Sequence, residues 1–338
     1  MLDNLKITIK MALAFTFFDT NSSGDRYEGY FKDGTLNGNG TFYSKSGAKY
    51  VGQFESNKKN GFGTYIFGTK SSNDRYEGYF KNDNLNGTVT LYYKSGAKYV
   101  GQFENETINS FGILTYETNS SSDRYEGYFK NSKFNGNGSF YWKDESSYVL
   151  QSGSWSYVIN NSIDGYEGYF RDREKDGNGT FYWKNGTKYV GEFKNDKMNG
   201  FGILTYPTNS SSDRYEGNFK DDKKDGSGTL YMKNRDKYEG HFKIDQKSGF
   251  GVFTNNAESH IDRFEGNFKE DEPKDDFGIL YWKNRIKFVG GFQGWNFTRH
   301  GTKFSSDGNV IEDGEWEGDV REMNSFKFKE NGKPGWFN

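Results

Sequence analysis

A glutamate and a tyrosine recur two residues apart in copies of the segment YEGY, a spacing that places both on one face of a β-strand. The residues are Glu28, Tyr30, Glu77, Tyr79, Glu126, Tyr128, Glu167 and Tyr169. Carboxylates attract basic groups, and tyrosine offers an apolar ring with a polar tip. The row could therefore bind a basic, partly apolar peptide or helix. Alternatively, each glutamate pairs with a lysine such as Lys32 across strands on a solvated face. We take the row as the candidate partner-binding face, because exposed tyrosines in series are unfavourable without a partner.

Residues that support catalysis or hold metals are few. The chain has no cysteine, and His241, His260 and His300 do not lie at metal-ligand spacing from one another. The repeated GNGT segments lack the Lys-Ser/Thr ending of a phosphate-binding loop, and they open a strand rather than a helix. No serine occurs in the strand–turn–helix context of a nucleophile elbow. We therefore expect no catalytic residue, no cofactor and no metal ion, and we do not expect an enzyme.

The composition describes a chain that folds despite its polarity. Its 338 residues carry 45 basic and 47 acidic side chains, and the formal net charge of −2 does not indicate a nucleic-acid-binding surface. Aromatic residues make up 19% of the chain although the mean hydropathy is −1.01. Disordered chains are poor in aromatic residues, so these must form a packed core. No apolar run approaches the ~20 residues of a membrane-spanning helix.

An internal repeat accounts for the aromatic content. The octapeptide DRYEGYFK starts at Asp25, Asp74 and Asp123, which gives a period of 49 residues. Shorter units start at the aromatic residue of each YEGYF-like block, in steps that alternate between 23 and 26 residues from Tyr27 to Tyr125 and again from Tyr166 to Phe264. The starts are Tyr27, Tyr50, Tyr76, Tyr99, Tyr125, Tyr166, Tyr189, Tyr215, Tyr238, Phe264 and Phe288. The octapeptide therefore marks a super-repeat of two units.

Each unit has the pattern of a β-hairpin. Tyr27, Gly29 and Phe31 alternate with polar residues, which is the period of a strand with one buried face. KDGTLNG at 32–38 and KNGTK at 184–188 have the composition of turns. A glycine inside a strand is unfavourable unless something packs closely against it, so we predict that a ring from the adjoining hairpin fills each gap. The expected core residues are Tyr27, Gly29, Phe31, Tyr76, Gly78, Phe80, Tyr125, Gly127 and Phe129.

The pattern Tyr-x-Gly-x-Phe, a turn, and Gly-x-Gly-x-Phe/Tyr resembles the MORN repeat (membrane occupation and recognition nexus). The resemblance runs from about Tyr27 to Asp319 and comprises eleven units. It implies an all-β fold, an elongated single-layer antiparallel meander of stacked hairpins, which the alternation and the turns also predict. It implies a scaffold rather than a catalyst, because MORN-repeat proteins often serve as cytoskeletal, ciliary or cortical scaffolds, including components of axonemal radial spokes. Some form homodimers.

The repeat pattern also predicts the domain organisation. We expect a single repeat array over 1–338 with two halves, 12–147 and 164–319. An irregular unit at 148–163 joins them, where the super-repeat is shortened. Residues 320–338 depart from the pattern and are predicted to cap the open edge of the sheet.

The first residues allow two interpretations. ALAFTFF at 12–18 aligns with GFGTYIF at 61–67 when the chain is shifted by one super-repeat. This alignment predicts the second strand of a truncated leading unit. The alternative is the apolar core of a signal peptide, flanked by Lys6 and Lys10.

The repeat pattern predicts a non-enzymatic protein–protein interaction scaffold, and the resemblance implies a role in cytoskeletal or ciliary assembly and hence a cytoplasmic protein. Its partner would be a peptide or helix in the groove of the ladder of hairpins, or a second copy of the chain in a homodimer. The alternative is a peripheral adaptor that binds membranes or phosphoinositides. Membrane contact would be weak, because acidic residues are interleaved with the basic ones. Nucleic acid is not an expected partner.

Overall fold

The computed structural model describes residues 12–17, 24–103, 107–117, 122–142, 164–255, 259–321, 327–330 and 333–335. Every regular element in these ranges is a β-strand. The chain forms two compact units, Met1–Glu174 and Lys175–Asn338, which we call the N-terminal unit and the C-terminal unit.

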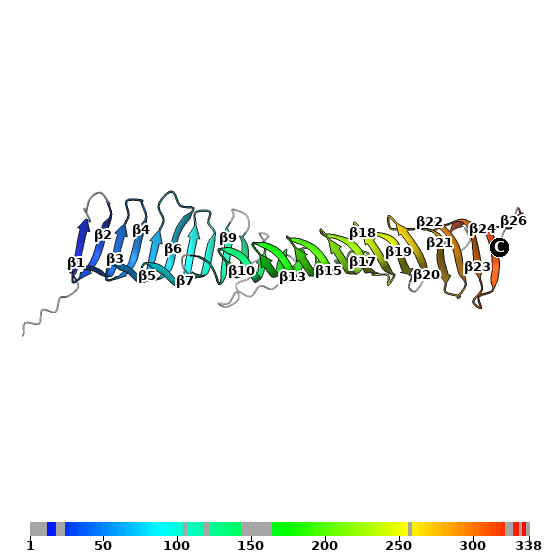
Figure 1. Cartoon of the computed structure of the whole chain (residues 1–338), viewed down its shortest axis with the longest axis horizontal. Coiled ribbons are helices and arrows are strands. Elements are labelled where there is room, and N and C mark those ends of the chain that lie inside the picture. Colours follow the sequence, from blue (N-terminus) through cyan, green and yellow to red (C-terminus); the bar gives the residue numbers. More distant parts are fainter. Residues whose placement is uncertain are drawn as a thin grey trace, which may run out of the picture. The chain divides into compact units, whose positions relative to one another are not determined.

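Within each unit the strands follow one another in chain order (Figure 1). The N-terminal unit contains β1 (Ala12–Phe17), β2 (Arg26–Lys32), β3 (Thr35–Tyr43), β4 (Lys49–Glu55), β5 (Lys58–Ile66), β6 (Asn73–Lys81), β7 (Asn84–Tyr93), β8 (Lys98–Phe103), β9 (Phe111–Glu117), β10 (Ser122–Lys130), β11 (Lys133–Tyr141) and β12 (Gly165–Arg171). The C-terminal unit contains β13 (Glu174–Tyr182), which begins at the boundary, β14 (Lys188–Lys194), β15 (Lys197–Thr205), β16 (Ser212–Lys220), β17 (Lys223–Met232), β18 (Lys237–Lys243), β19 (Gln246–Thr254), β20 (Ile261–Lys269), β21 (Glu272–Trp282), β22 (Lys287–Gln293), β23 (Asn296–Phe304), β24 (Val310–Asp319), β25 (Lys327–Glu330) and β26 (Lys333–Gly335).

Successive strands pair antiparallel, so each unit is a meander of hairpins. Gly29 of β2 lies opposite Gly40 of β3, and Gly40 also lies opposite Gly52 of β4. Pairing of this kind runs from β1 to β12 in the N-terminal unit. It runs from β13 to β26 in the C-terminal unit. The predicted all-β fold of successive antiparallel hairpins is confirmed.

A two-residue turn connects β2 to β3. Asp33 and Gly34 form it with φ angles of 50° and 74°. Two positive φ angles are the type I′ geometry, whose twist matches that of the flanking strands. Asn195 and Asp196 form the same turn in the C-terminal unit, because asparagine and aspartate tolerate the left-handed region. The predicted turn at 32–38 was too long, since β3 already begins at Thr35.

The first glycine of the Gly-x-Gly segment lies in a β-bulge. Gly29 is opposite Gly40, but two residues later Phe31 is opposite Leu36, so β3 carries extra residues between the two pairs. Gly38 lies among these extra residues with a φ of 78°, a conformation that would strain a residue with a side chain. A bulge of this kind bends the strand and strengthens its twist.

The second glycine of the segment lies under an aromatic ring. Tyr27 packs over Gly29 and Gly40, and a Cβ on either glycine would overlap that ring. Two super-repeats further on, Tyr125 covers Gly138, where a Cβ would come within 2.6 Å of the tyrosine oxygen. The prediction that the ring comes from the adjoining hairpin is wrong, because tyrosine and both glycines belong to one hairpin. Residues i and i+2 share a face of a strand, so the tyrosine already lies beside its own glycine.

The hydroxyl of the covering tyrosine reaches the backbone of the bulge. Tyr27 Oη donates to the carbonyl of Tyr30 at 3.2 Å, and Tyr189 Oη donates to the carbonyl of Glu192 at 3.0 Å. Both tyrosines are 0% exposed, so an unbonded hydroxyl would be unfavourable. The bond explains why this position holds tyrosine in most of the units.

Edge-to-face ring pairs link each hairpin to the next. Tyr27 contacts Phe31 of its own strand at 5.3 Å between centroids, and it contacts Phe54 of the following hairpin at 5.0 Å. Tyr50 likewise contacts Phe54 at 5.1 Å and Phe80 at 4.9 Å. Such pairs contribute about 0.5–1.5 kcal/mol each beyond the burial of area. The core is therefore a chain of interlocking rings that continues from hairpin to hairpin.

Tyr76 departs from this arrangement. Val89, fully buried, stands opposite Gly78 at the position where the other hairpins have the ring-covered glycine. A Cβ on Gly78 would meet Val89 Cγ2 at 2.9 Å rather than a ring. Tyr76 is displaced and stacks on Tyr65, with 5.1 Å between centroids. Our expectation for Tyr76 is therefore corrected: it packs beside the ring-over-glycine core, half-buried, because GTVT replaces GNGT.

The second residue of several turns ties its hairpin to the preceding one. Asn57 Oδ1 accepts a hydrogen bond from the Leu36 amide at 2.8 Å, and the Asn57 amide donates to the Leu36 carbonyl at 3.1 Å. Asp196 makes the same two bonds with Lys175, at 2.9 Å and 3.0 Å. Turn residues that the sequence marked only as turn formers therefore also join neighbouring hairpins.

At its first strand the chain agrees with the sequence analysis, since β1 pairs with β2 as the second strand of a leading unit. The predicted irregular unit at 148–163 lies outside the described residues, and the boundary between the two units falls later, at Glu174. Within the predicted cap at 320–338, β25 pairs with β24 and β26 pairs with β25.

Candidate functional site

The predicted row of glutamates and tyrosines lies on the face of the sheet opposite the buried tyrosines, which we call the outer face. The glutamates of the row are half-buried. Its tyrosines, Tyr30, Tyr79, Tyr128 and Tyr169, are 38%, 59%, 53% and 39% exposed. Large rings with this exposure are available to a partner, so the structure brings the predicted residues onto one accessible face.

Three of the four glutamates, Glu28, Glu77 and Glu126, pair with arginines of their own strand. Arg26 Nη2 lies 3.1 Å from Glu28 Oε1, and Arg75 Nε lies 2.9 Å from Glu77 Oε1. Arg124 pairs with the third glutamate of the row. The expected partner was a lysine such as Lys32 on a neighbouring strand, but residues two apart in a strand share a face and are closer. The carboxylates are thus largely neutralised before any partner arrives.

The same arginines stack on tyrosines of the next strand. Arg26 lies over the Tyr43 ring at 4.2 Å from its centroid, and Arg75 lies over Tyr92 at 3.8 Å. Lys98 approaches the Tyr92 ring at 5.5 Å. Cation–π contacts of this kind contribute about 0.5–1 kcal/mol at exposed sites. In this part of the outer face, the charged groups and the rings therefore already interact with one another.

Two of the exposed tyrosines, Tyr79 and Tyr128, stand in pairs with phenylalanines that the sequence did not reveal. Phe62 lies opposite Tyr79 with 5.5 Å between centroids and 75° between the ring planes. Phe111 lies opposite Tyr128 at 5.6 Å and 80°. Phe62 and Phe111 are 51% and 52% exposed. The segment NGFGTY, where other units have NGNGTF, was the available signal.

The C-terminal unit has the phenylalanines of these pairs but not the tyrosines. Phe201 and Phe250 are 56% and 58% exposed, and they lie opposite Asn218 and Asn267. The two units therefore share the buried core but differ on the outer face.

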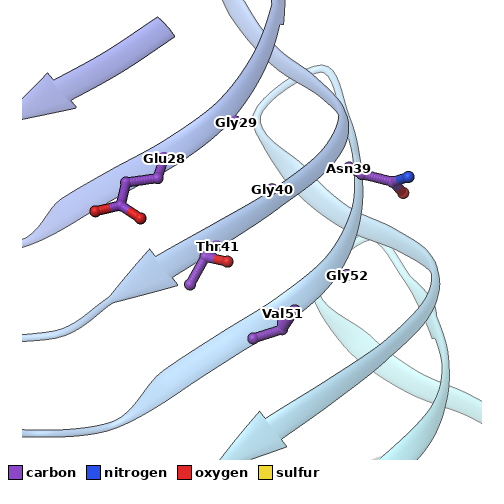
Figure 2. Close-up of a pocket in the computed structure, with 7 residues that line it drawn as sticks. All are labelled: Glu28, Gly29, Asn39, Gly40, Thr41, Val51 and Gly52. Carbon is purple, nitrogen blue, oxygen red and sulfur yellow. The ribbon is translucent and has the colours of Figure 1, made fainter. Parts of the chain in front are cut away.

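A shallow depression of about 460 Å³ lies over β2, β3 and β4. Figure 2 shows its lining: Glu28, Thr41 and Val51 side by side on the three strands, Gly29, Gly40 and Gly52 next to them, and Asn39 beyond the glycines. Glycines leave backbone accessible, so the depression offers peptide groups as well as side chains to a bound molecule.

The ring-covered glycines and the alternating hairpins agree with a known repeat. The sequence model of the MORN repeat matches eight segments: 27–49, 50–72, 76–98, 125–147, 166–188, 189–211, 215–237 and 238–256. These segments cover more than half of the chain. It belongs to the MORN-repeat family. No curated protein matches the sequence.

Three of the eleven units inferred from the sequence, at Tyr99, Phe264 and Phe288, are not among the eight matched MORN repeats. They nevertheless have the same construction, because Tyr99 covers Gly101 and Gly112 as Tyr27 covers its own pair of glycines. MORN repeats are generally non-catalytic, and no catalytic domain is matched.

Burial perturbs the titratable groups of the MORN core. It raises the pKa of Tyr50 to about 12. Burial also raises the pKa of Tyr125. It lowers the pKa of Lys247, whose Nζ lies 5.5 Å from the centroid of the Tyr238 ring. These groups face the packed rings rather than a cavity, so their shifts concern stability.

The described residues offer few other chemical groups. His260 Nε2 lies 3.0 Å from the Val320 carbonyl, and His300 Nε2 lies 3.6 Å from Asp313 Oδ2. Within the described ranges, no three histidine, aspartate or glutamate side chains come together as a metal site. The described strands are accompanied by no helix that could cross a membrane.

Proposed function

We propose that this MORN-repeat chain is a non-enzymatic scaffold that binds other proteins through the outer face of its N-terminal unit. The observation that supports this most is the pairing of exposed rings, Phe62 with Tyr79 and Phe111 with Tyr128, at the same place in two super-repeats. Aromatic residues dominate binding energy when a partner removes them from water. The glutamates of the row contribute less, because their arginines already pair with them.

The construction of the sheet suits this function. The paired rings stand on adjacent, hydrogen-bonded strands, and residues on strands are held more accurately than residues on loops. A partner would therefore meet a surface that is already arranged, which lowers the entropy lost on binding.

The test is capture of native partners by the full-length protein, using proximity labelling and pull-down in cells that produce it naturally. The variant is Tyr30→Ser/Tyr79→Ser/Tyr128→Ser, and the matched control is Phe201→Ser/Phe250→Ser in the C-terminal unit. All five side chains are exposed, so we expect both variants to keep the circular dichroism spectrum of the wild type. We expect the triple variant to lose at least one partner that the control retains. Equal capture by the triple variant and the wild type would move the site to another surface.

We propose further that the scaffold acts in a cytoskeletal or ciliary assembly in the cytoplasm, on the resemblance to other MORN proteins. Imaging of the tagged protein at its natural level, with extraction of soluble protein before fixation, tests the assignment. Retention on filaments or axonemes is the expected result, and complete extraction contradicts it. Radial spokes have no specific support from the described residues or from the repeat match.

A peripheral adaptor for anionic membranes is the alternative function. It draws on outer-face lysines such as Lys49 and Lys188, each of which contributes about 1 kcal/mol when close to an anionic leaflet. The ion pairs of the neighbouring arginines oppose it. Flotation with phosphoinositide-containing liposomes at low and physiological salt separates the two functions, and the scaffold predicts no lipid-dependent flotation.

A further inference from the structure

We propose that the outer face of the N-terminal unit binds an uncharged, proline-rich segment of a protein in the polyproline II conformation, laid across the strands. The inference rests on the proposed scaffold function and names the chemical class of its partner. It depends on the shape of the ring pairs, the neutrality of their row and the distance between them.

Each ring pair forms a notch rather than a flat platform. The planes of Phe62 and Tyr79 meet at 75°, so the two rings form the walls of a V-shaped opening. Both rings are more than half exposed, so the opening faces solvent. Polyproline II segments are typically recognised between aromatic side chains, because the pyrrolidine ring fits such an opening and the segment is already extended.

A glutamine accompanies each notch. Gln53 Oε1 accepts a hydrogen bond from the Phe62 amide at 3.3 Å, which holds its side chain beside the ring. An amide whose oxygen is bound in this way still has two N–H donors. A polyproline II segment presents unbonded backbone carbonyls, because that conformation has no internal hydrogen bonds. Gln102 has the corresponding position beside Phe111, next to the paired Gly101 and Gly112.

The notches lie in one line of side chains that crosses the strands, and this line, which does not include the glutamates, carries no charge in the N-terminal unit. Its residues, from β2 to β12, are Tyr30, Asn39, Gln53, Phe62, Tyr79, Thr88, Gln102, Phe111, Tyr128, Asn137 and Tyr169. The next row holds the glutamates, of which Glu28, Glu77 and Glu126 are paired with arginines. A neutral row of rings and amides complements an uncharged segment, since a buried unpaired charge would be unfavourable.

The C-terminal unit shows what the same positions look like without the notches. Where the N-terminal unit has glutamine, phenylalanine and tyrosine, the C-terminal unit has Glu192, Phe201 and Asn218. The next set replaces glutamine by His241 and tyrosine by Asn267. Each set keeps one exposed ring but lacks the second wall.

The spacing of the notches matches the pitch of polyproline II. The first notch lies on β5 and β6, and the second lies on β9 and β10, so four inter-strand intervals separate them. Four intervals of about 4.8 Å give roughly 19 Å. Polyproline II rises about 3.1 Å per residue with three residues per turn, so two turns span roughly 18.6 Å. Prolines about six residues apart would therefore face the same side of the segment and reach both notches.

An open depression borders the first notch and extends the surface. Its lining includes Tyr79, Phe80, three asparagines, the two glycines Gly61 and Gly87, and one charged residue, Lys81. Side-chain amides at this place can bond to the carbonyls of a segment that continues past the notch.

The direct test uses full-length protein and labelled synthetic peptides of about 14 residues, measured by fluorescence anisotropy. One peptide carries two Pro-Pro pairs about six residues apart in a serine and alanine background, and a second carries them about eight residues apart, so that they face different sides. A third peptide has no proline. We expect the peptide with the six-residue spacing to bind most tightly, with an affinity at least about fivefold higher than that of the peptide with the eight-residue spacing. The peptide without proline should bind most weakly.

Variants then locate the binding. Tyr79→Asn/Tyr128→Asn installs the residue found in the C-terminal unit, and we expect it to weaken binding of the first peptide by about tenfold or more. Gln53→Ala/Gln102→Ala should weaken it by a few fold, for lack of the amide donors. Phe201→Ser/Phe250→Ser should leave it unchanged. Unaltered melting temperatures show that each variant is folded.

Several results overturn the proposal. They are absence of binding by all three peptides, equal affinity for the six- and eight-residue spacings, and equal affinity of the wild type and Tyr79→Asn/Tyr128→Asn. Binding of linear oligosaccharides to the notches in place of the peptides, in a competition experiment, also overturns it. If a native partner is lost in the Tyr30/Tyr79/Tyr128 variant while no proline peptide binds, the scaffold function stands and this proposal fails. If neither effect is seen, both fail.

Discussion

Two glycines that look equivalent in each Gly-x-Gly segment serve the fold differently. Gly136 has a φ of 90° and lies in the bulge, whereas Gly138 lies under the Tyr125 ring. The first glycine is needed for its backbone conformation, and the second is needed for its missing side chain. Substitutions at the two positions therefore act by different mechanisms.

The requirement for a missing side chain predicts a large difference between two glycines on adjacent strands. A Cβ on Gly138 would come within 2.6 Å of the Tyr125 oxygen, whereas a Cβ on Gly165 would meet its nearest atoms at 3.7 Å. We expect Gly138→Ala to reduce the free energy of unfolding by about 1–3 kcal/mol, as overpacking does. Gly165→Ala should change it by less than about 0.5 kcal/mol. Urea unfolding measures both, and equal effects would contradict the ring-over-glycine explanation.

Buried tyrosines predict a loss of stability in alkali. Burial raises the pKa of Tyr50 to about 12 in the folded chain, whereas an unfolded tyrosine titrates near 10.0. Above the unfolded pKa only the unfolded chain releases its proton, so stability is complete below about pH 10 and is lost as the pH rises toward 12. Burial raises the pKa of Tyr125 and Tyr189 as well, so the effects accumulate.

We expect the urea midpoint to fall steeply between about pH 10 and pH 12. A midpoint that stays constant over this range would contradict the raised pKa of the buried rings.

At this scale the sequence predicted the residues that repeat and missed those that break the repeat. Tyr27, Gly29 and Phe31 were identified because alternation and recurrence mark a buried face. The effect of Val89 on Tyr76 was not predictable from either residue, because it requires their contact across two strands. The notch residue Phe62 was overlooked since a single phenylalanine in the sequence does not reveal its cross-strand partner.

Among the elements, the hairpin is the structural unit, and its turn is what attaches it to its neighbour. Asp196 uses both its side chain and its amide to bond to Lys175 of the preceding hairpin. Ring pairs such as Tyr189 with Phe219 join neighbouring hairpins through the core. Hairpin pairing was predictable from alternation and turn composition, but these links between hairpins were not, because aspartate and asparagine are expected in turns for conformational reasons alone.

The link predicts a graded series at one turn residue. Asp196→Asn keeps the acceptor and tolerates the φ of 68°, as Asn57 does in the N-terminal unit, so stability should change little. Asp196→Gly loses the acceptor but accepts the conformation, and we expect a loss of about 1 kcal/mol. Asp196→Ala loses the acceptor and also tolerates the left-handed conformation poorly, so we expect its stability to fall by about 1 kcal/mol more than that of Asp196→Gly. Thermal unfolding of the three variants gives the order, and equal values for Asn and Ala would exclude the hydrogen bond as the cause.

At the scale of the whole chain, both units repeat one construction, so stability is expected to be local. Each hairpin is bonded to the strands before and after it, as in other repeat proteins with nearest-neighbour energetics. The family and the all-β meander could be predicted from the repeated Tyr-x-Gly-x-Phe pattern, its alternation and its turns. The position of the boundary between the units could not, because Glu174 lies in an ordinary repeat.

Local stability predicts how a core defect spreads. Tyr215→Ala removes a ring that covers Gly217 and Gly228 in the C-terminal unit. We expect hydrogen exchange to accelerate by at least about tenfold in β15–β18 and to remain unchanged in β2–β5. Uniform acceleration across both units would show that the chain unfolds as one cooperative body instead.

The direction of the turn contacts has a consequence for how the protein is made. Asn57 reaches back to Leu36, and Asp196 reaches back to Lys175, so each hairpin docks on one that has already left the ribosome. Nascent chains emerge over seconds to tens of seconds, whereas a hairpin forms in microseconds. Each hairpin could therefore fold and dock on the preceding one as it emerges, without contacts to residues that are not yet translated.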